Sequence, residues 1–133
     1  MLAIMKTREE LDELSRIILG AAVRVHKEMG PGLLESVYQV CLVEEFGMRE
    51  IPLQTLLPIP LIYRGRVLKK DYVIDILVED EIILELKAIE SILPVHEAQL
   101  ISYLKLADKR LGFLINFNVP LLKSGFRRFV NKF

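Results

Sequence analysis

Hydrophobic residues in the first third of the chain recur at helical spacing. From Leu11 to Met29, apolar side chains return every three or four residues, which is the period of an amphipathic helix. Gly30-Pro31-Gly32 then ends the pattern. A second helical pattern runs from Leu33 to Gly47, with apolar residues on one side and Glu44 and Glu45 on the other. We therefore expect two helices that meet at a sharp corner.

The middle of the chain changes to the patterns of β-strands. Leu57 to Tyr63 and Val67 to Val78 are rich in β-branched, aliphatic and aromatic residues, and the turn signal Arg64-Gly65 separates them. They predict a β-hairpin. The acidic turn at residues 79–81 leads into a third apolar run, Ile82 to Lys87, so the three strands are expected to form an antiparallel meander.

The last third predicts one more helix and one more strand. A helical stretch follows Pro94 and continues to about Ala107, and Leu111 to Phe117 has the composition of a strand. Lys123 to Phe133 contains four basic residues and no acid, which predicts a short basic tail or helix. The expected order is helix, helix, three strands, helix, strand, an α/β (α+β) arrangement.

Composition limits the class of protein. With 133 residues, 52% of them hydrophobic and 27% charged, the chain is long and apolar enough for one domain with a substantial core, and disordered and collagen-like chains are excluded. The hydrophobic share is slightly above that of a usual soluble domain, which favours a homo-oligomer that covers apolar surface. Eighteen basic and eighteen acidic residues balance, so any contact with a nucleic acid must be local.

Cysteine usage and the apolar stretches bear on the compartment. The single cysteine, Cys41, can form no internal disulfide and belongs to no zinc or iron-sulfur cluster, which fits a reducing cytoplasm. Met1 to Lys6 lacks the pattern of a signal peptide, and Ile51 to Tyr63 is short and broken by three prolines. We expect neither a leader nor a membrane span.

Asp75, Glu85 and Lys87 stand out because they are charged residues within apolar strands. Burial of such groups is unfavourable unless they pair or bind something. Glu85 and Lys87 are two residues apart, so they share one face of a strand, and closure of the hairpin at residues 79–81 would bring Asp75 opposite Glu85. Two carboxylates and an ammonium group are the minimum for a hydrated divalent cation and an attacking water.

An ordinary structural role is the alternative for these residues. Asp75 and Glu85 would then pair with Lys87, or with Lys69 and Lys70, at the surface of the sheet.

Several other polar or aromatic side chains have local patterns that fit structural roles. Glu35 lies in the first turn of the second predicted helix with Tyr38 one turn later, and Gln99 and Tyr103 share a face of the next helix. Taken locally, these patterns predict a helix start, a core aromatic, polar helix edges and structural positions for Glu35, Tyr38, Gln99, Tyr103, His96, Glu97, His26 and Cys41.

The order of the motifs changes this interpretation. Gly32-Leu-Leu-Glu35-Ser-Val-Tyr38 matches the pattern GxxExxY, and it precedes Asp75, Glu85-Leu-Lys87, and Gln99 with Tyr103. With this series the chain resembles the bacterial and archaeal GxxExxY proteins, which are assigned to the PD-(D/E)XK nuclease superfamily. The resemblance runs from about Leu14 to Val119, nearly the whole chain.

This resemblance implies a restriction-endonuclease-like core. The expected fold is a central mixed β-sheet flanked by helices, in the order α-β-β-β-α-β with an extra N-terminal helix, within a single nuclease-like domain over residues 1–133. The proline that often precedes the first acid of the motif is replaced by Ile74, as in many members.

The resemblance also implies roles for individual residues. Asp75 and Glu85 correspond to the metal-binding acids, Glu35 to an acid contributed by the first core helix, and Lys87 to the catalytic lysine. Gln99 and Tyr103 resemble an element that positions substrate beside the metal.

The implied activity is metal-assisted hydrolysis of phosphodiester bonds in DNA or RNA, with Mg²⁺ or Mn²⁺ rather than zinc as the cofactor. The alternatives are a catalytically inactive nuclease-fold module for nucleic-acid binding or protein assembly, and a structural protein.

Two groups of basic residues are candidates for contact with the nucleic acid. A homodimer would double these groups and cover excess apolar surface. A solvated edge is the alternative for each group. The hairpin group contains Arg64, Arg66, Lys69 and Lys70, and the C-terminal group contains Lys123, Arg127, Arg128 and Lys132.

Overall fold

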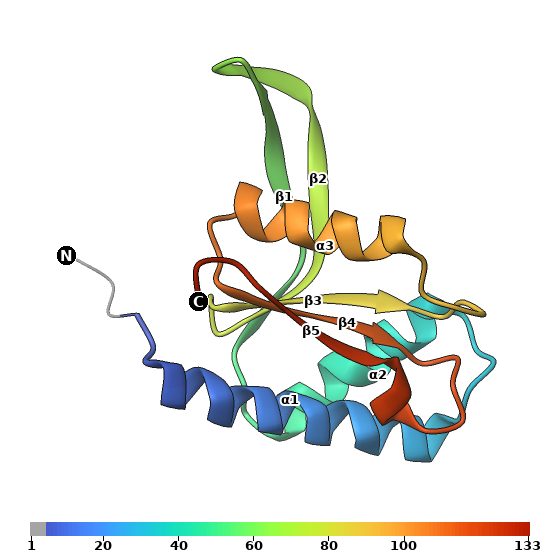
Figure 1. Ribbon diagram of the computed structural model, residues 1–133. Coiled ribbons are helices and arrows are strands. Elements are labelled where there is room, and N and C mark those ends of the chain that lie inside the picture. Colours follow the sequence, from blue (N-terminus) through green and yellow to red (C-terminus); the bar gives the residue numbers. More distant parts are fainter. Residues whose placement is uncertain (1–4) are drawn as a thin grey trace.

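The structure, a computed structural model, describes residues 5–133 (Figure 1). Its elements follow the predicted order and add a short 3-10 helix and a strand at the end. The helices are α1 (Arg8–Met29), α2 (Glu35–Met48) and α3 (Pro94–Leu106). The other elements are β1 (Leu53–Tyr63), β2 (Arg66–Val78), β3 (Ile82–Lys87), β4 (Leu111–Asn116), the 3-10 helix η1 (Leu122–Gly125) and β5 (Phe126–Val130).

Five strands form one mixed sheet in the order β1-β2-β3-β4-β5. β3 and β4 are parallel, and the other neighbouring strands are antiparallel. A parallel pair needs a crossover connection, which α3 supplies here. The predicted meander and the α+β, restriction-endonuclease-like sheet are therefore confirmed.

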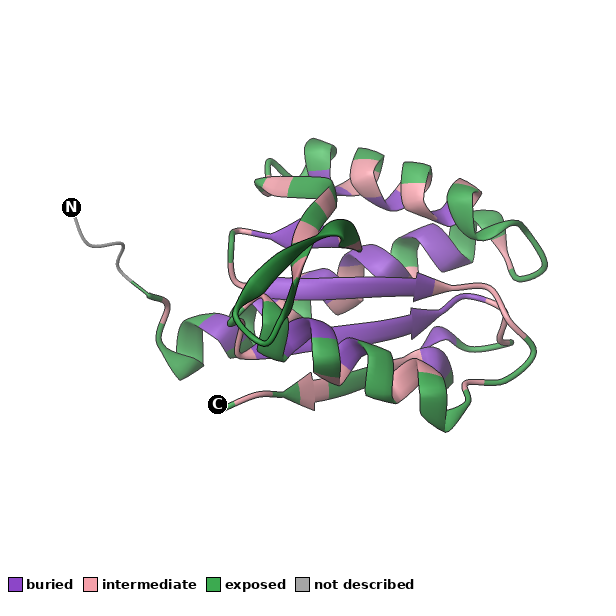
Figure 2. Ribbon diagram, turned by 90° about the horizontal axis from the view of Figure 1, so that it is seen from above, coloured by how far each residue is buried: buried purple, intermediate pink, exposed green. Residues whose placement is uncertain are grey.

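Helices cover both faces of the central strands. On one face, α1 and α2 pack through residues such as Leu14 and Tyr38 against Leu84 of β3. On the other face, α3 packs through Leu100 against Ile83 of β3. Figure 2 shows the central strands as buried ribbons between helices whose outer surfaces are exposed. Burial on both faces explains why β3 and β4 are almost continuously apolar.

Tyr38 fixes the corner between α1 and α2. Its hydroxyl donates to the carbonyl oxygen of Gly30 at 2.5 Å and accepts from the N–H of Leu33 at 3.1 Å. The buried ring stacks on Phe117 with centroids 4.5 Å apart. Gly32 lies in this corner with φ of 95°, a conformation that glycine adopts without strain. Tyr38 is thus the core aromatic predicted from its spacing, and its contacts place the start of α2.

The C-terminal segment corrects the prediction of a basic tail or helix. After η1, residues 126–130 form β5, which pairs antiparallel with β4 and is the edge strand on that side of the sheet. Phe126 stacks on Phe113 at 4.6 Å between centroids, on the face covered by α1 and α2, whereas Phe129 packs on the α3 face. Anchoring by both phenylalanines explains why this basic segment is a strand.

Gly125, at the end of η1, offers a direct test of this C-terminal packing. A Cβ atom at this buried position would collide with the carbonyl oxygen of Asn116 on the neighbouring backbone. We expect Gly125→Ala to lower the free energy of unfolding by about 2–3 kcal/mol, as overpacking does elsewhere. Urea denaturation measures the change. Gly47→Ala in α2 is the matched control, because its Cβ meets nothing within 4 Å and alanine favours helix. Unchanged stability of Gly125→Ala would contradict this packing.

The hairpin of β1 and β2 rises out of the sheet and beyond α3 (Figure 1). We call residues 57–73 of this hairpin the arm. Near its base, Leu57, Ile59 and Tyr72 pack against the cluster beneath α3, whereas residues 62–71 are all exposed. The arm is therefore anchored at one end and free at the other.

No helix within residues 5–133 is both long enough and apolar enough to cross a lipid bilayer. The expectation that Met1 to Lys6 holds no leader concerns mostly residues that lie outside the described part of the chain.

Candidate metal and active site

Asp75 and Glu85 face each other across the β2–β3 hairpin. The register pairs Ile76 with Leu84, which puts Asp75 opposite Glu85. The N–H of Asp75 is 3.5 Å from Oε1 of Glu85, and the N–H of Leu86 donates to Oδ2 of Asp75 at 2.9 Å. Main-chain N–H groups just beyond the end of this ladder thus hold the two carboxylates next to each other.

Burial opposes ionisation of this pair. Glu85 is 5% exposed, and desolvation, followed by repulsion from Asp75, raises its pKa to about 8. Partial burial also raises the pKa of Asp75, although the hydrogen bond from Leu86 and the charge of Lys87 oppose that shift. Two adjacent carboxyls with raised pKa values form a site that a divalent cation would stabilise.

Lys87 follows Glu85 on the same face of β3, and its positive charge acts on all three acids, Glu35, Asp75 and Glu85. Within residues 5–133, however, no ion pair of 4 Å or less includes any of these four residues. Asp75 and Glu85 therefore form no direct ion pair with Lys87, Lys69 or Lys70 in this structure, although the charge of Lys87 acts on both acids.

Glu35 approaches the pair from a different element. It is the first residue of α2, its side chain is exposed, and the start of its helix is positioned by the Tyr38 contacts described above. Desolvation by the surrounding protein and then repulsion from Asp75 raise its pKa. The GxxExxY spacing thus has a structural reason: the tyrosine holds the corner from which the glutamate projects.

The donor set fits a hydrated Mg²⁺ or Mn²⁺ ion. Mg²⁺ in proteins is usually held by one or two carboxylates together with waters and substrate phosphates, and Asp75 and Glu85 supply two. Among residues 5–133, no group of three or more His, Cys, Asp and Glu side chains is gathered closely enough to hold a metal. Glu35 therefore stands outside the immediate pair in this conformation, and its role as a ligand stays a prediction.

Gln99 and Tyr103 of α3 lie beside the carboxylates. Nε2 of Gln99 donates to the Tyr103 hydroxyl at 3.1 Å. Tyr103 is largely buried, and desolvation followed by repulsion from Glu85 raises its pKa. The i, i+4 pair predicted from the sequence is thus formed next to Glu85.

Two amide side chains that the sequence analysis did not select support this site. Nε2 of Gln39 in α2 donates to the carbonyl oxygen of Asp75 at 3.4 Å. Asn116, which is 2% exposed at the end of β4, accepts from the N–H of Ile89 at 3.1 Å and donates to its carbonyl oxygen at 2.9 Å. The sequence feature that could have identified Asn116 is an amide at the end of an apolar strand, where a buried polar side chain needs hydrogen-bond partners. Its contacts fix the chain just beyond Lys87.

The two groups of basic residues differ in their surroundings. In the C-terminal group, Arg127 pairs with Glu97 at 3.5 Å, and Arg128 pairs with Asp12 at 3.8 Å and lies over the ring of Phe133. All four cations of the arm are exposed and take part in none of the ion pairs found within residues 5–133. The arm thus offers the more available positive charge.

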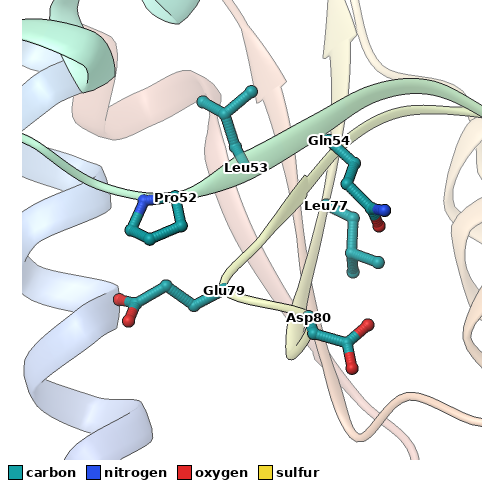
Figure 3. A pocket seen from close by; sticks show the side chains of 6 residues that line it. All are labelled: Pro52, Leu53, Gln54, Leu77, Glu79 and Asp80. Carbon is teal, nitrogen blue, oxygen red and sulfur yellow. The ribbon is translucent and has the colours of Figure 1, made fainter.

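A separate surface hollow lies at the turn end of β2. Figure 3 shows its lining, which comprises Pro52, Leu53, Gln54, Leu77, Glu79 and Asp80. This lining contains neither a cation nor Asp75 or Glu85, so the hollow is separate from the carboxylate pair.

Comparison with known proteins agrees with this fold. A sequence profile described as the PD-(D/E)XK nuclease superfamily matches residues 12–129. No curated protein and no solved structure gives a significant match. The narrower likeness to GxxExxY proteins stays a prediction. Since the match spans all the strands and helices that build the carboxylate site, the chain belongs to the PD-(D/E)XK nuclease superfamily.

Proposed function

We propose that the protein is a nuclease that hydrolyses phosphodiester bonds of DNA or RNA with Mg²⁺ or Mn²⁺ held by Asp75 and Glu85. Members of its superfamily generally use divalent metal ions. The observation that carries the proposal is the pair itself: two adjacent, desolvated carboxyls that form no ion pair within the described residues. A structural pair would be expected to have a neutralising partner.

Each residue of the site has a role in this proposal. A bound divalent cation supplies charge stabilisation at the scissile phosphate and lowers the pKa of a water. Asp75 and Glu85 hold the cation, with Glu35 as a further acid beside them. Lys87 orients or deprotonates the attacking water or holds a phosphate oxygen. Gln99 and Tyr103 position the substrate.

The second candidate is a catalytically inactive module that keeps the fold and binds nucleic acid or assembles with proteins. The observation that favours it is electrostatic. The net charge is zero, Lys87 is the cation whose charge acts on the three acids, and the exposed cations of the arm stand apart from the carboxylates. The homodimer, the cytoplasmic location and membership of the GxxExxY group belong to the proposal as predictions from the sequence.

Cleavage by a Lys87→Met variant tests the catalytic role. We expect Lys87→Met to lower the rate of cleavage of labelled DNA or RNA in Mg²⁺ or Mn²⁺ by about 100-fold or more, because positioned acid, base and charge effects have that size. Metal binding should persist, since the carboxylates remain. Lys105→Met, at an exposed position of α3, is the matched control and should cleave like the wild type.

Two results would count against these assignments. Equal cleavage by wild type and Lys87→Met would remove Lys87 from the mechanism. Metal binding by the wild type without cleavage of any DNA or RNA substrate would favour the inactive module.

A further inference from the structure

The arm reaches far from the carboxylate pair. Residue 56 of β1 lies across from Asp75 in the register of the hairpin, and Gly65 at the tip is nine positions further along the chain. At about 3.3 Å per residue, this is a reach of about 30 Å. Figure 1 shows that the ribbon stands clear of the helices over its outer part. Any long substrate bound at the carboxylates can therefore meet the arm at a distance.

Positive charge is concentrated on this arm. It carries Arg64, Arg66, Lys69 and Lys70 against the single acid Asp71, a net charge of +3 in a chain whose total is zero. Lys69 and Lys70 lie where the register of β1 and β2 shifts, between the pairs Pro60–Asp71 and Ile62–Val67. A bulge of this kind increases local twist, so these lysines sit on a twisted part of the ribbon.

The candidate active site needs positive charge elsewhere on the protein to bind a nucleic acid. Among the charged groups of residues 5–133 that act on one another at this site, Glu35, Asp75 and Glu85 are acids and Lys87 is the one cation, so the site itself offers little positive charge to bind phosphates. Affinity for nucleic acids comes mostly from phosphate neutralisation. The exposed cations of the arm can supply it without disturbing the carboxylates.

The base of the arm is joined to the site. Tyr72 meets Tyr103 edge-on with centroids 5.7 Å apart, and Tyr103 is hydrogen-bonded to Gln99. The same base packs against the core beneath α3. The arm is thus held in a defined position relative to the carboxylates, as it would have to be to bind a substrate at a fixed distance from them.

The shape of the arm favours duplex DNA over duplex RNA. A two-stranded β-ribbon fits the major groove of B-DNA, which is about 12 Å wide, whereas the major groove of A-form RNA is deep and narrow. Near the tip, Tyr63 and Val67 are 62% and 70% exposed and offer apolar contacts to thymine methyl groups. The reach of about 30 Å is close to one turn of B-DNA, about 34 Å.

The exposed apolar residues of the arm do not by themselves indicate pairing with a second copy. β1 is the edge strand of the sheet and contains Pro58 and Pro60, which have no N–H to donate to an added strand. Charge also opposes pairing of two copies through their arms, because two arms with net positive charge would repel each other.

We infer that the arm lies in the major groove of duplex DNA and holds it about one helical turn from the bond presented to Asp75 and Glu85. This inference rests on the proposed function, because it names duplex DNA as the substrate class of that site. It predicts that affinity rises steeply once a duplex is long enough to span both places, between about 8 and about 20 base pairs.

Fluorescence anisotropy in a chelator tests the arm without cleavage. Labelled DNA duplexes of several lengths and an RNA duplex of the same sequence are titrated with wild type, with Arg64→Ala/Arg66→Ala and with Lys69→Ala/Lys70→Ala. Lys27→Ala/Lys105→Ala removes the same charge from exposed positions of α1 and α3 and is the matched control. Circular dichroism confirms that each variant is folded.

We expect wild type to bind the long DNA duplex about tenfold more tightly than the short duplex or the RNA. Each arm variant should bind the long DNA about tenfold more weakly, whereas the control keeps its affinity. The slope of log affinity against log salt concentration should be shallower by about two in each arm variant. No binding of duplex DNA by wild type at low salt, equal binding of RNA, or unchanged arm variants would overturn the inference. So would an arm variant that changes the sedimentation coefficient but not the DNA affinity, because the arm would then serve a second copy.

The experiments distinguish a failure of the inference about the arm from a failure of the proposed nuclease function. Binding that depends on the arm, without cleavage in Mg²⁺ or Mn²⁺, would support the arm and contradict the proposed enzyme. Metal-dependent cleavage with full affinity in both arm variants would support the enzyme and contradict the arm.

Discussion

Glu85→Gln is expected to make the metal-free protein more stable than the wild type at alkaline pH. The pKa of Glu85 is raised from 4.5 to about 8 by desolvation and by Asp75. A carboxyl whose pKa is raised by folding is favoured in its protonated form, so the wild type loses stability as the pH rises from about 4.5 to about 8. Glutamine resembles the neutral acid in shape and does not ionise, so it escapes this loss.

The expected difference is large for a single substitution. A shift of this size corresponds to roughly 3–5 kcal/mol between the variant and the wild type when pH 5 is compared with pH 9. Urea denaturation at several pH values in a chelator measures it. Glu44→Gln, an exposed carboxyl of α2, should give a curve parallel to that of the wild type. Parallel curves for Glu85→Gln as well would show that burial does not hold this carboxyl neutral.

Asp75→Asn is expected to abolish cleavage without unfolding the protein. Asparagine keeps an oxygen that can accept the hydrogen bond from the Leu86 N–H, now 2.9 Å long, so the hairpin should persist. The negative charge that would hold the cation is lost. Because a bound metal contributes several kcal/mol to transition-state stabilisation, cleavage should fall by about 1,000-fold or more.

The measurement is the initial rate on a labelled substrate at saturating Mg²⁺ and Mn²⁺. Asp71→Asn, on the exposed arm only four residues earlier, is the matched control and removes the same charge from the same strand. It should cleave at least as well as wild type, since it removes the one acid of the arm. Full activity of Asp75→Asn would place the chemistry elsewhere.

The carboxylate pair could be predicted because short-range rules determine its register. Glu79 and Asp80 have φ of 47° and 59°, as in a tight hairpin turn with two positive φ values, and that turn fixes which residues of β2 and β3 are opposite. Period-two alternation then puts Asp75, Glu85 and Lys87 on one face. The helices could be predicted as well, since their apolar residues recur with the helical period.

The features that the sequence analysis did not predict depend on contacts between residues that are distant in the sequence. β5 has the sequence Phe-Arg-Arg-Phe-Val, which lacks alternation, and it becomes a strand because Phe126 and Phe129 pack on opposite faces of β4. The arm has the apolar composition of a buried strand, yet its outer part is exposed, because pattern alone does not show where a sheet ends. The support from Gln39 and Asn116 is likewise visible only once the strands are assembled.

The most direct test of the metal-dependent site is calorimetric titration of Mn²⁺ into the wild type and into Asp75→Asn at pH 8. A site built on Asp75 and Glu85 predicts saturable binding to the wild type that is lost in the variant. Identical isotherms for the two proteins, or no binding to the wild type at millimolar Mn²⁺, would contradict it.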